Sequence, residues 1–229
     1  MMRKIIGKII DIVLPPSEKE TASKEAPPPA KEVKAVSLEQ LLGGALGEAP
    51  AEPDLRVIGL YSSVEDEKIA ELTQALLYLN EMNRLLPEGK EKKPVEFYIN
   101  TYGGSADDMF AMYDVMQSVM EETEIHTIGV GKVMSAGTLL LAAGTKGKRK
   151  IGKNCRVMIH NVAAGNFGNL PNLANELEAI QTLQEDYIAA MVDNTKFTRK
   201  KLEKLLNEKV NIYLSAEEAV KYGLADEIM

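Results

Sequence analysis

Short apolar runs alternate with segments of helical periodicity from about Asp54 to the end of the chain. Arg56–Tyr61 is the first apolar run, and its length predicts a β-strand. In the next segment, Val64–Leu79, apolar residues recur every three or four positions, which predicts a helix with one buried face: Ile69, Leu72, Leu76 and Leu79. The folded part of the chain is therefore expected to open with a strand and a helix.

The same order of strand and helix recurs through the rest of the chain. After a polar stretch, the pattern predicts in turn a strand at Val95–Asn100, a helix at Ala106–Met120, a strand at Ile125–Val130, a helix containing Leu139–Ala143, and a strand at Arg156–His160. Alternating strands and helices indicate βαβ crossovers and a largely parallel sheet, so the expected fold class is α/β. Ligands of such sheets bind at the carboxyl ends of the strands.

The first 53 residues follow a different pattern. Residues 1–16 have apolar residues at helical spacing, interrupted by charged ones, which predicts an amphipathic helix rather than a signal peptide or membrane span. Such a helix suits docking on a protein, the favoured interpretation, or lying on a membrane surface. Residues 17–53 are rich in Lys, Glu, Ala and Pro and predict a flexible tether, with a small docking helix at Ser37–Gly43. One folded domain, residues 54–229, is expected to follow.

The net charge and the cysteine content exclude some classes of protein. A net charge of -7 and the lack of a basic stripe argue against a nucleic-acid partner. Cys155 is the only cysteine, which excludes an internal disulfide and favours a reducing, cytoplasmic compartment. It lies among apolar residues and is interpreted as a small buried hydrophobe. His126 starts a strand, at the edge of the sheet opposite the carboxyl ends, and receives no catalytic role.

Ser135 stands between an apolar strand and the apolar helix containing Leu139–Ala143. A serine in this position can project its hydroxyl while the helix N-terminus supplies backbone N–H groups and a positive dipole end. This suits a nucleophile beside an oxyanion hole. The position also suits a serine that only caps the helix, and this feature alone favours the cap over a nucleophile.

Two other features are predicted at the same edge of the sheet. Gly103 and Gly104 lie between a strand and a helix, where glycines let the backbone approach a bound chain, although such a pair is also typical of a tight turn. His160 ends a strand, where a histidine is often structural. Because the carboxyl ends of parallel strands share an edge, Ser135, the glycine pair and His160 are expected to converge, as a catalytic site requires.

Residues 54–229 resemble the ClpP peptidase family. Four groups of motifs carry the resemblance, in the family's order and spacing: Tyr98-Ile99-Asn100 before Gly103-Gly104, Met134-Ser135-Ala136-Gly137 before Leu140-Leu141-Ala142-Ala143-Gly144, Arg156-Val157-Met158-Ile159-His160, and Leu214-Ser215-Ala216-Glu217-Glu218-Ala219 before Tyr222-Gly223-Leu224. The resemblance implies a ClpP/crotonase-like fold, with βαβ superhelical units and a strand-helix handle at about residues 161–195. In that handle, Gly165–Asn169 would be the strand and Leu173–Asp193 the long helix.

The resemblance also implies the roles of individual residues. Ser135 would be the nucleophile and His160 its general base, with Asn211 at the third position of the triad. The remaining site residues would be the backbone donors to the oxyanion, Gly104 and Ala136, and the substrate-binding turn, Gly103, Gly104 and Ser105. No metal or organic cofactor is implied.

The implied activity is that of the proteolytic subunit of an ATP-dependent Clp protease, a serine endopeptidase. Its substrates would be unfolded polypeptides, cleaved inside a chamber formed by two heptameric rings, a tetradecamer. The implied partners are a hexameric AAA+ unfoldase ATPase and ClpP-like subunits of the same or another kind.

Four departures from the family pattern leave alternatives open. The third triad residue of the family is usually an aspartate, where this chain has Asn211, and the arginine beside it is replaced by Val210. Tyr102 stands where proline is common, and the long N-terminal region, docking helix or propeptide, replaces a short pore-lining segment. A catalytically weak or inactive structural subunit of a mixed ring is therefore the main alternative. A crotonase-type acyl-CoA enzyme, which shares the fold, is a weaker one.

Overall fold

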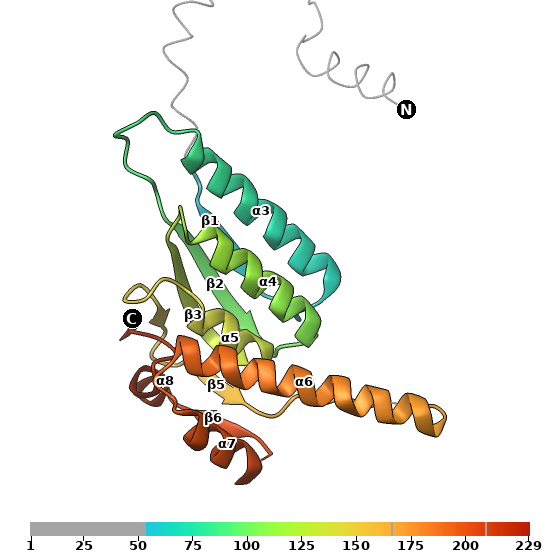
Figure 1. Ribbon diagram of the computed structural model, residues 1–229. Helices are drawn as coiled ribbons and strands as arrows, with labels where there is room; N and C mark the ends of the chain where they lie inside the picture. Colours follow the sequence, from blue (N-terminus) through green and yellow to red (C-terminus); the bar gives the residue numbers. More distant parts are fainter. Residues whose placement is uncertain (1–53, 166, 209) are drawn as a thin grey trace, which may run out of the picture. The chain divides into compact units, whose positions relative to one another are not determined.

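The computed structural model describes residues 54–165, 167–208 and 210–229 (Figure 1). The predicted N-terminal helix at 1–16 and tether at 17–53 lie outside these residues and stay predictions. The elements in chain order are β1 (Val57–Leu60), α3 (Asp66–Arg84), β2 (Val95–Thr101), α4 (Ala106–Val119), β3 (Ile125–Met134), α5 (Ala136–Ala142), β4 (Lys150–Ile151), β5 (Arg156–Ile159), α6 (Leu170–Asn194), α7 (Arg199–Glu208), β6 (Ile212–Leu214), α8 (Ala216–Tyr222) and β7 (Glu227–Ile228).

The sheet is mostly parallel, in the order β1-β2-β3-β4-β7, and it branches at β3. β3 pairs with β2 from Ile125 to Val133, on its other side with β4 and, through its last three residues, with β5. β5 in turn pairs antiparallel with β6. The parallel pairs are joined by helical crossovers, as the alternation of patterns predicts. The α/β fold class expected from the sequence is confirmed.

Helices pack on the sheet because this packing buries their apolar faces. The helices α3 and α4 pack side by side, and their inward residues, such as Leu76 and Met112, are fully buried (Figure 1). All seven residues of α5 are buried, which explains why its sequence is apolar on every side. Burying one leucine contributes about 1.5–3 kcal/mol, so a helix with three consecutive buried leucines is a firm support for the residue at its start.

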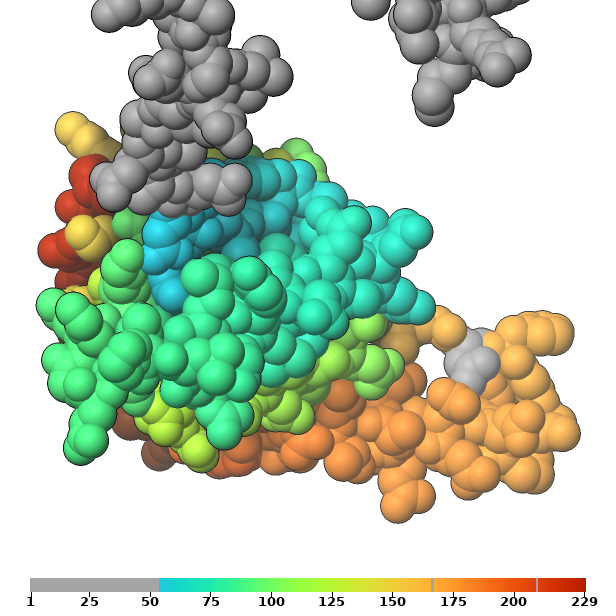
Figure 2. All heavy atoms as spheres, turned by 90° about the horizontal axis from the view of Figure 1, so that it is seen from above, coloured from blue at the N-terminus to red at the C-terminus, as the bar shows by residue number. Residues whose placement is uncertain are grey.

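The long helix α6 is buried at one end only. Tyr187, Ile188 and Met191 lie in the core, whereas the first half of the helix extends beyond the sheet and is mostly exposed (Figures 1 and 2). The strand expected at Gly165–Asn169 is absent from the described residues of that segment. The reason is physical: a strand needs a neighbour for its backbone hydrogen bonds, and none of the described strands lies beside this segment. Among the described helices, none has the length and apolar character that crossing a membrane requires.

Candidate active site

Ser135 occupies a strained turn between β3 and α5. Its backbone has φ 52° and ψ -124°, and it is the only described residue other than glycine with a positive φ. Such a conformation costs on the order of 1–3 kcal/mol and persists only where neighbouring contacts enforce it. Two contacts do so here: the Ser135 N–H donates to the Met158 carbonyl at 2.8 Å, and the Ser135 carbonyl accepts from the Thr138 N–H at 2.9 Å.

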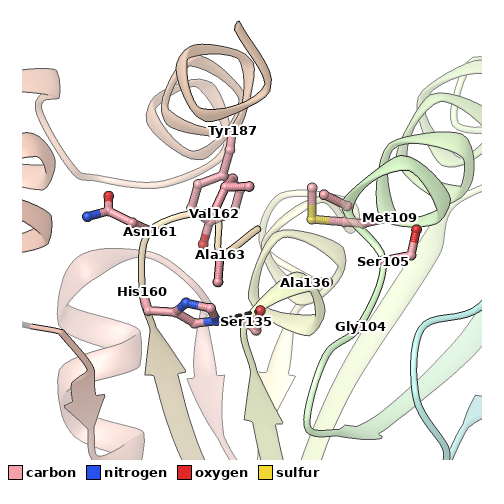
Figure 3. A pocket seen from close by; sticks show the side chains of 11 residues that line it. Gly104, Ser105, Met109, Ser135, Ala136, His160, Asn161, Val162, Ala163 and Tyr187 are labelled. Carbon is pink, nitrogen blue, oxygen red and sulfur yellow. Dashed lines mark hydrogen bonds between the residues drawn. The ribbon is translucent and has the colours of Figure 1, made fainter. Parts of the chain in front are cut away.

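The serine hydroxyl is turned toward a histidine rather than toward the helix. Ser135 is at the N-cap position of α5, yet its side chain makes no capping hydrogen bond. Instead, its Oγ lies 2.8 Å from Nε2 of His160 (Figure 3). This distance suits a hydroxyl that donates to the neutral imidazole, the geometry from which a general base takes the proton.

Strand pairing explains why these two residues meet. Val133 and Met134 of β3 lie opposite Val157 and Met158 of β5. The two strands run parallel, so Ser135 and His160, which follow them, emerge at the same edge. His126 lies at the other end of β3, where its Nε2 is 2.9 Å from a carboxylate oxygen of Glu124.

The glycine turn lies directly against the serine. A Cβ on Gly103 would come within 2.5 Å of the Ser135 Cβ, and a Cβ on Gly104 within 2.1 Å of the Val64 carbonyl oxygen. Both glycines have positive φ values, 99° and 156°, so a side chain at either position would be strained as well as crowded. The turn is held by Val64, whose N–H donates to the Gly103 carbonyl at 2.9 Å and whose carbonyl accepts from the Ser105 N–H at 2.8 Å.

A cavity of about 230 Å³ opens beside the serine and histidine (Figure 3). Gly104 and Ala136 line it, and within the described part of the chain no hydrogen bond uses the backbone N–H of either residue. Such free donors near a nucleophile can stabilise an oxyanion. Ser105 lines the same cavity, and its Oγ caps α4 by accepting from the Asp108 N–H at 3.2 Å.

Asn211 is close to His160 in the strand pairing but makes no hydrogen bond to it among the described residues. It is exposed and lies just before β6. β6 places it near the base, because Ile212 pairs with Ile159, the residue before His160. Val210, its neighbour, is also exposed and lines a second hollow together with His160.

Two residues behind the cavity were not expected from the sequence. Tyr187 of α6 is buried and lines the cavity, and its hydroxyl lies 3.0 Å from Oγ1 of Thr138 on α5. Burial raises the pKa of Tyr187 to about 12, only partly opposed by its hydrogen bond to Thr138, so the phenol is neutral. In the sequence Thr138 stands just before the apolar run Leu139–Ala143 and Tyr187 lies within a long predicted helix, and no local signal connects the two residues. Cys155 is buried as expected, and desolvation raises the pKa of its thiol to about 11, which leaves it unreactive.

A hydroxyl and an imidazole in contact at the carboxyl edge of a parallel sheet, beside a cavity with free N–H donors, are typical of the serine hydrolases. Comparison with known proteins narrows the class. The family model described as Clp protease matches residues 53–229. The chain is also 34% identical, over 174 residues, to the "ATP-dependent Clp protease proteolytic subunit" of Deinococcus radiodurans, covering 76% of this chain and 80% of that protein. The chain belongs to the Clp protease family, a family of serine peptidases.

Proposed function

We propose that this chain is the proteolytic subunit of an ATP-dependent Clp protease, with Ser135 as its nucleophile. The 2.8 Å contact between Ser135 Oγ and His160 Nε2 carries the proposal. It supports an active subunit over the alternative of a purely structural one. Membership of the Clp protease family decides against the acyl-CoA enzyme.

The proposed reaction is peptide-bond hydrolysis through an acyl-enzyme. His160 Nε2 takes the hydroxyl proton as Ser135 Oγ bonds to the peptide carbonyl carbon, and the carbonyl becomes an oxyanion. The N–H groups of Gly104 and Ala136 stabilise that charge. His160 then returns the proton to the leaving nitrogen as the C–N bond breaks. His160 then takes a proton from a water molecule as the water oxygen bonds to the ester carbon. The bond between that carbon and Ser135 Oγ breaks, and His160 gives the proton from water to Oγ, which restores the serine hydroxyl.

The substrate-binding surface is proposed to be the turn at Gly103, Gly104 and Ser105 together with the adjoining groove. The groove shares Ser105 and Val162 with the cavity and continues along α6. An extended polypeptide suits this shape, because its backbone can lie along the glycine turn with one side chain in the cavity. Unfolded polypeptides are therefore the proposed substrates, and neither metal nor organic cofactor enters the mechanism.

The assembly and partners follow from the family and are proposals for this chain. We expect heptameric rings that pair into a tetradecamer, of this chain alone or with ClpP-like subunits, and a hexameric AAA+ ATPase that supplies unfolded chains in the cytoplasm. Asn211 is proposed as the third member of the triad, where its side-chain oxygen would accept a hydrogen bond from the imidazole.

Covalent labelling tests the nucleophile directly. A fluorophosphonate probe should label Ser135 in the assembled protein, and Ser135→Ala and His160→Ala should each lower peptide hydrolysis by about 10³-fold or more. His126→Ala is the matched control, because His126 lies at the other end of β3, and it should keep labelling and hydrolysis. An assembled, folded protein in which Ser135 stays unlabelled and peptides stay intact would support the structural subunit instead.

A further inference from the structure

A chain of hydroxyl groups runs from the long helix α6 to the carbonyl of Ser135. Oγ1 of Thr138 lies 2.6 Å from the Ser135 carbonyl oxygen and 3.0 Å from the hydroxyl of Tyr187. Thr138 and Tyr187 are both buried, so water does not compete for these hydrogen bonds.

The direction of each hydrogen bond follows from the groups involved. A carbonyl oxygen only accepts, so the single hydroxyl proton of Thr138 is donated to Ser135. Thr138 Oγ1 then has only acceptor capacity for its second contact, so the Tyr187 O–H is the donor. A neutral phenol is required for this, and the raised pKa of Tyr187 maintains it at physiological pH.

The carbonyl of Ser135 and the N–H of Ala136 belong to one peptide unit. That unit is planar, and none of the described peptide bonds is cis, so the C=O and the N–H point in opposite directions. Hydrogen bonds that fix the carbonyl on one side therefore fix the direction of the N–H on the other. The Thr138 N–H, at 2.9 Å, is one such bond, and the Thr138 hydroxyl is the second.

We propose that Thr138 and Tyr187 are positioning residues that orient the Ser135–Ala136 peptide plane and so aim the Ala136 N–H at the developing oxyanion. The inference rests on the proposed peptidase function. It explains why two hydroxyl groups occupy a site that apolar side chains would fill at lower desolvation cost. It also connects α6, which lines the cavity through Tyr187, to the strained turn at Ser135.

Kinetics of three variants test the proposal. Thr138→Val removes the hydroxyl at nearly constant volume and should lower kcat by about 10-fold with KM within about twofold, since an oxyanion donor acts in the transition state. Tyr187→Phe keeps the ring that lines the cavity and should lower kcat by a smaller factor, about 3-fold. Thr138→Ser retains the hydroxyl, and its kcat should stay within about twofold of that of the original chain. A peptide boronate, which forms a tetrahedral adduct on a serine, should lose affinity in parallel with kcat.

A purely structural role gives a different result. It lowers the melting temperature of Thr138→Val and Tyr187→Phe but leaves kcat of the folded fraction and boronate affinity unchanged, and that result overturns the proposal. A Thr138→Ser variant with a kcat as low as that of Thr138→Val would also overturn the proposal. If the original chain neither hydrolyses peptides nor reacts at Ser135, the peptidase function fails on its own. Crystal structures then decide the positioning claim: the Ser135–Ala136 plane should rotate in Thr138→Val and Tyr187→Phe, and an unchanged plane in both refutes it.

Discussion

At the scale of single residues, the main question is how His160 is held. In a serine triad the third residue fixes the imidazole tautomer, and an aspartate also stabilises the imidazolium that forms when the serine is deprotonated. An asparagine can accept the hydrogen bond but carries no charge. Asn211 is exposed and, among the described residues, makes no hydrogen bond to His160, so the role proposed for it requires its side-chain oxygen to approach the ring.

Asn211→Asp tests this position. We expect the change to raise kcat for peptide hydrolysis or to leave it within about twofold, because a carboxylate supports the imidazolium at least as well as an amide. Asn211→Ala is the matched control and should lower kcat, since it removes the hydrogen-bond acceptor. A collapse of activity in Asn211→Asp alone would show that the third position has been misassigned.

Sequence patterns identify site residues only where the local pattern marks them. Ser135 and His160 stand at the ends of apolar strands, so their meeting at one edge follows from the parallel order of the strands. Thr138 and Tyr187 belong to helices that pack together only in the tertiary structure. Neither has a periodicity that differs from an ordinary core residue, and their contact was therefore not predictable.

At the scale of elements, one buried arginine connects the ends of two helices to the C-terminal segment. Arg149 is buried and donates to the carbonyls of Ala142, at the end of α5, and Asn194, at the end of α6. Its guanidinium also forms a two-point pair with Asp226, with distances of 2.9 and 2.6 Å. The ends of α5 and α6 are thus tied to the C-terminal segment beside β4.

The protonation of Asp226 should therefore control stability in acid. Partial burial opposes ionisation of this carboxylate, but hydrogen bonds from the Arg149 side chain and from the backbone N–H groups of Arg149 and Gly147 outweigh it and lower its pKa from 3.8 to about 2. Because the folded pKa is depressed, the stabilisation is complete above about pH 4 and is lost as the pH falls toward 2. Its size is about 2 kcal/mol.

Asp226→Asn should lower the free energy of unfolding by about 2 kcal/mol at pH 7, measured by urea denaturation. The difference from the original chain should narrow at pH 3, which lies below the ordinary pKa of 3.8, because the Asp226 carboxyl of the unfolded chain is then mostly protonated. Glu227→Gln is the control, because its ion pair with Lys150 is exposed, and it should leave stability nearly unchanged. An equal loss of unfolding free energy at pH 7 and pH 3 would show that the stabilisation comes from packing and not from the charge of Asp226.

Elements with a marked hydrophobic pattern were predictable, including the four-residue strands β1 and β5, whereas the two-residue strands were not. The helix predicted at Ala106–Met120 and the strand at Val95–Asn100 match α4 and β2 within a residue, because each has enough turns or alternations to show a period. The short strands β4 and β7 have two residues each and carry no period. The strand expected at Gly165–Asn169 came from the resemblance, and no described strand pairs with the described residues of that segment.

At the scale of the whole molecule, the outer half of α6 exposes apolar side chains that we expect another protein to cover. Three large apolar residues of that half, Leu170, Leu173 and Leu177, are 79, 37 and 56% exposed. An exposed apolar face of this kind is typical of a surface that contacts another protein. It lies in the segment that the resemblance predicts to be the handle, and we propose that another subunit covers it in the assembled protein.

Native mass spectrometry with a peptidase assay tests this expectation. The fragment of residues 54–229 should assemble as the full chain does, because the family model matches residues 53–229 and leaves nearly all of the N-terminal region unmatched. The double change Leu173→Asp and Leu177→Asp should shift the full chain toward smaller species, down to the single chain of 25.1 kDa, since unpaired carboxylates in an apolar contact are costly. Leu85→Asp, at an exposed leucine outside α6, is the control and should keep the assembly. If the α6 variant assembles fully while Ser135 still reacts with the probe, α6 does not mediate assembly, and the contact between rings must be sought elsewhere on the domain.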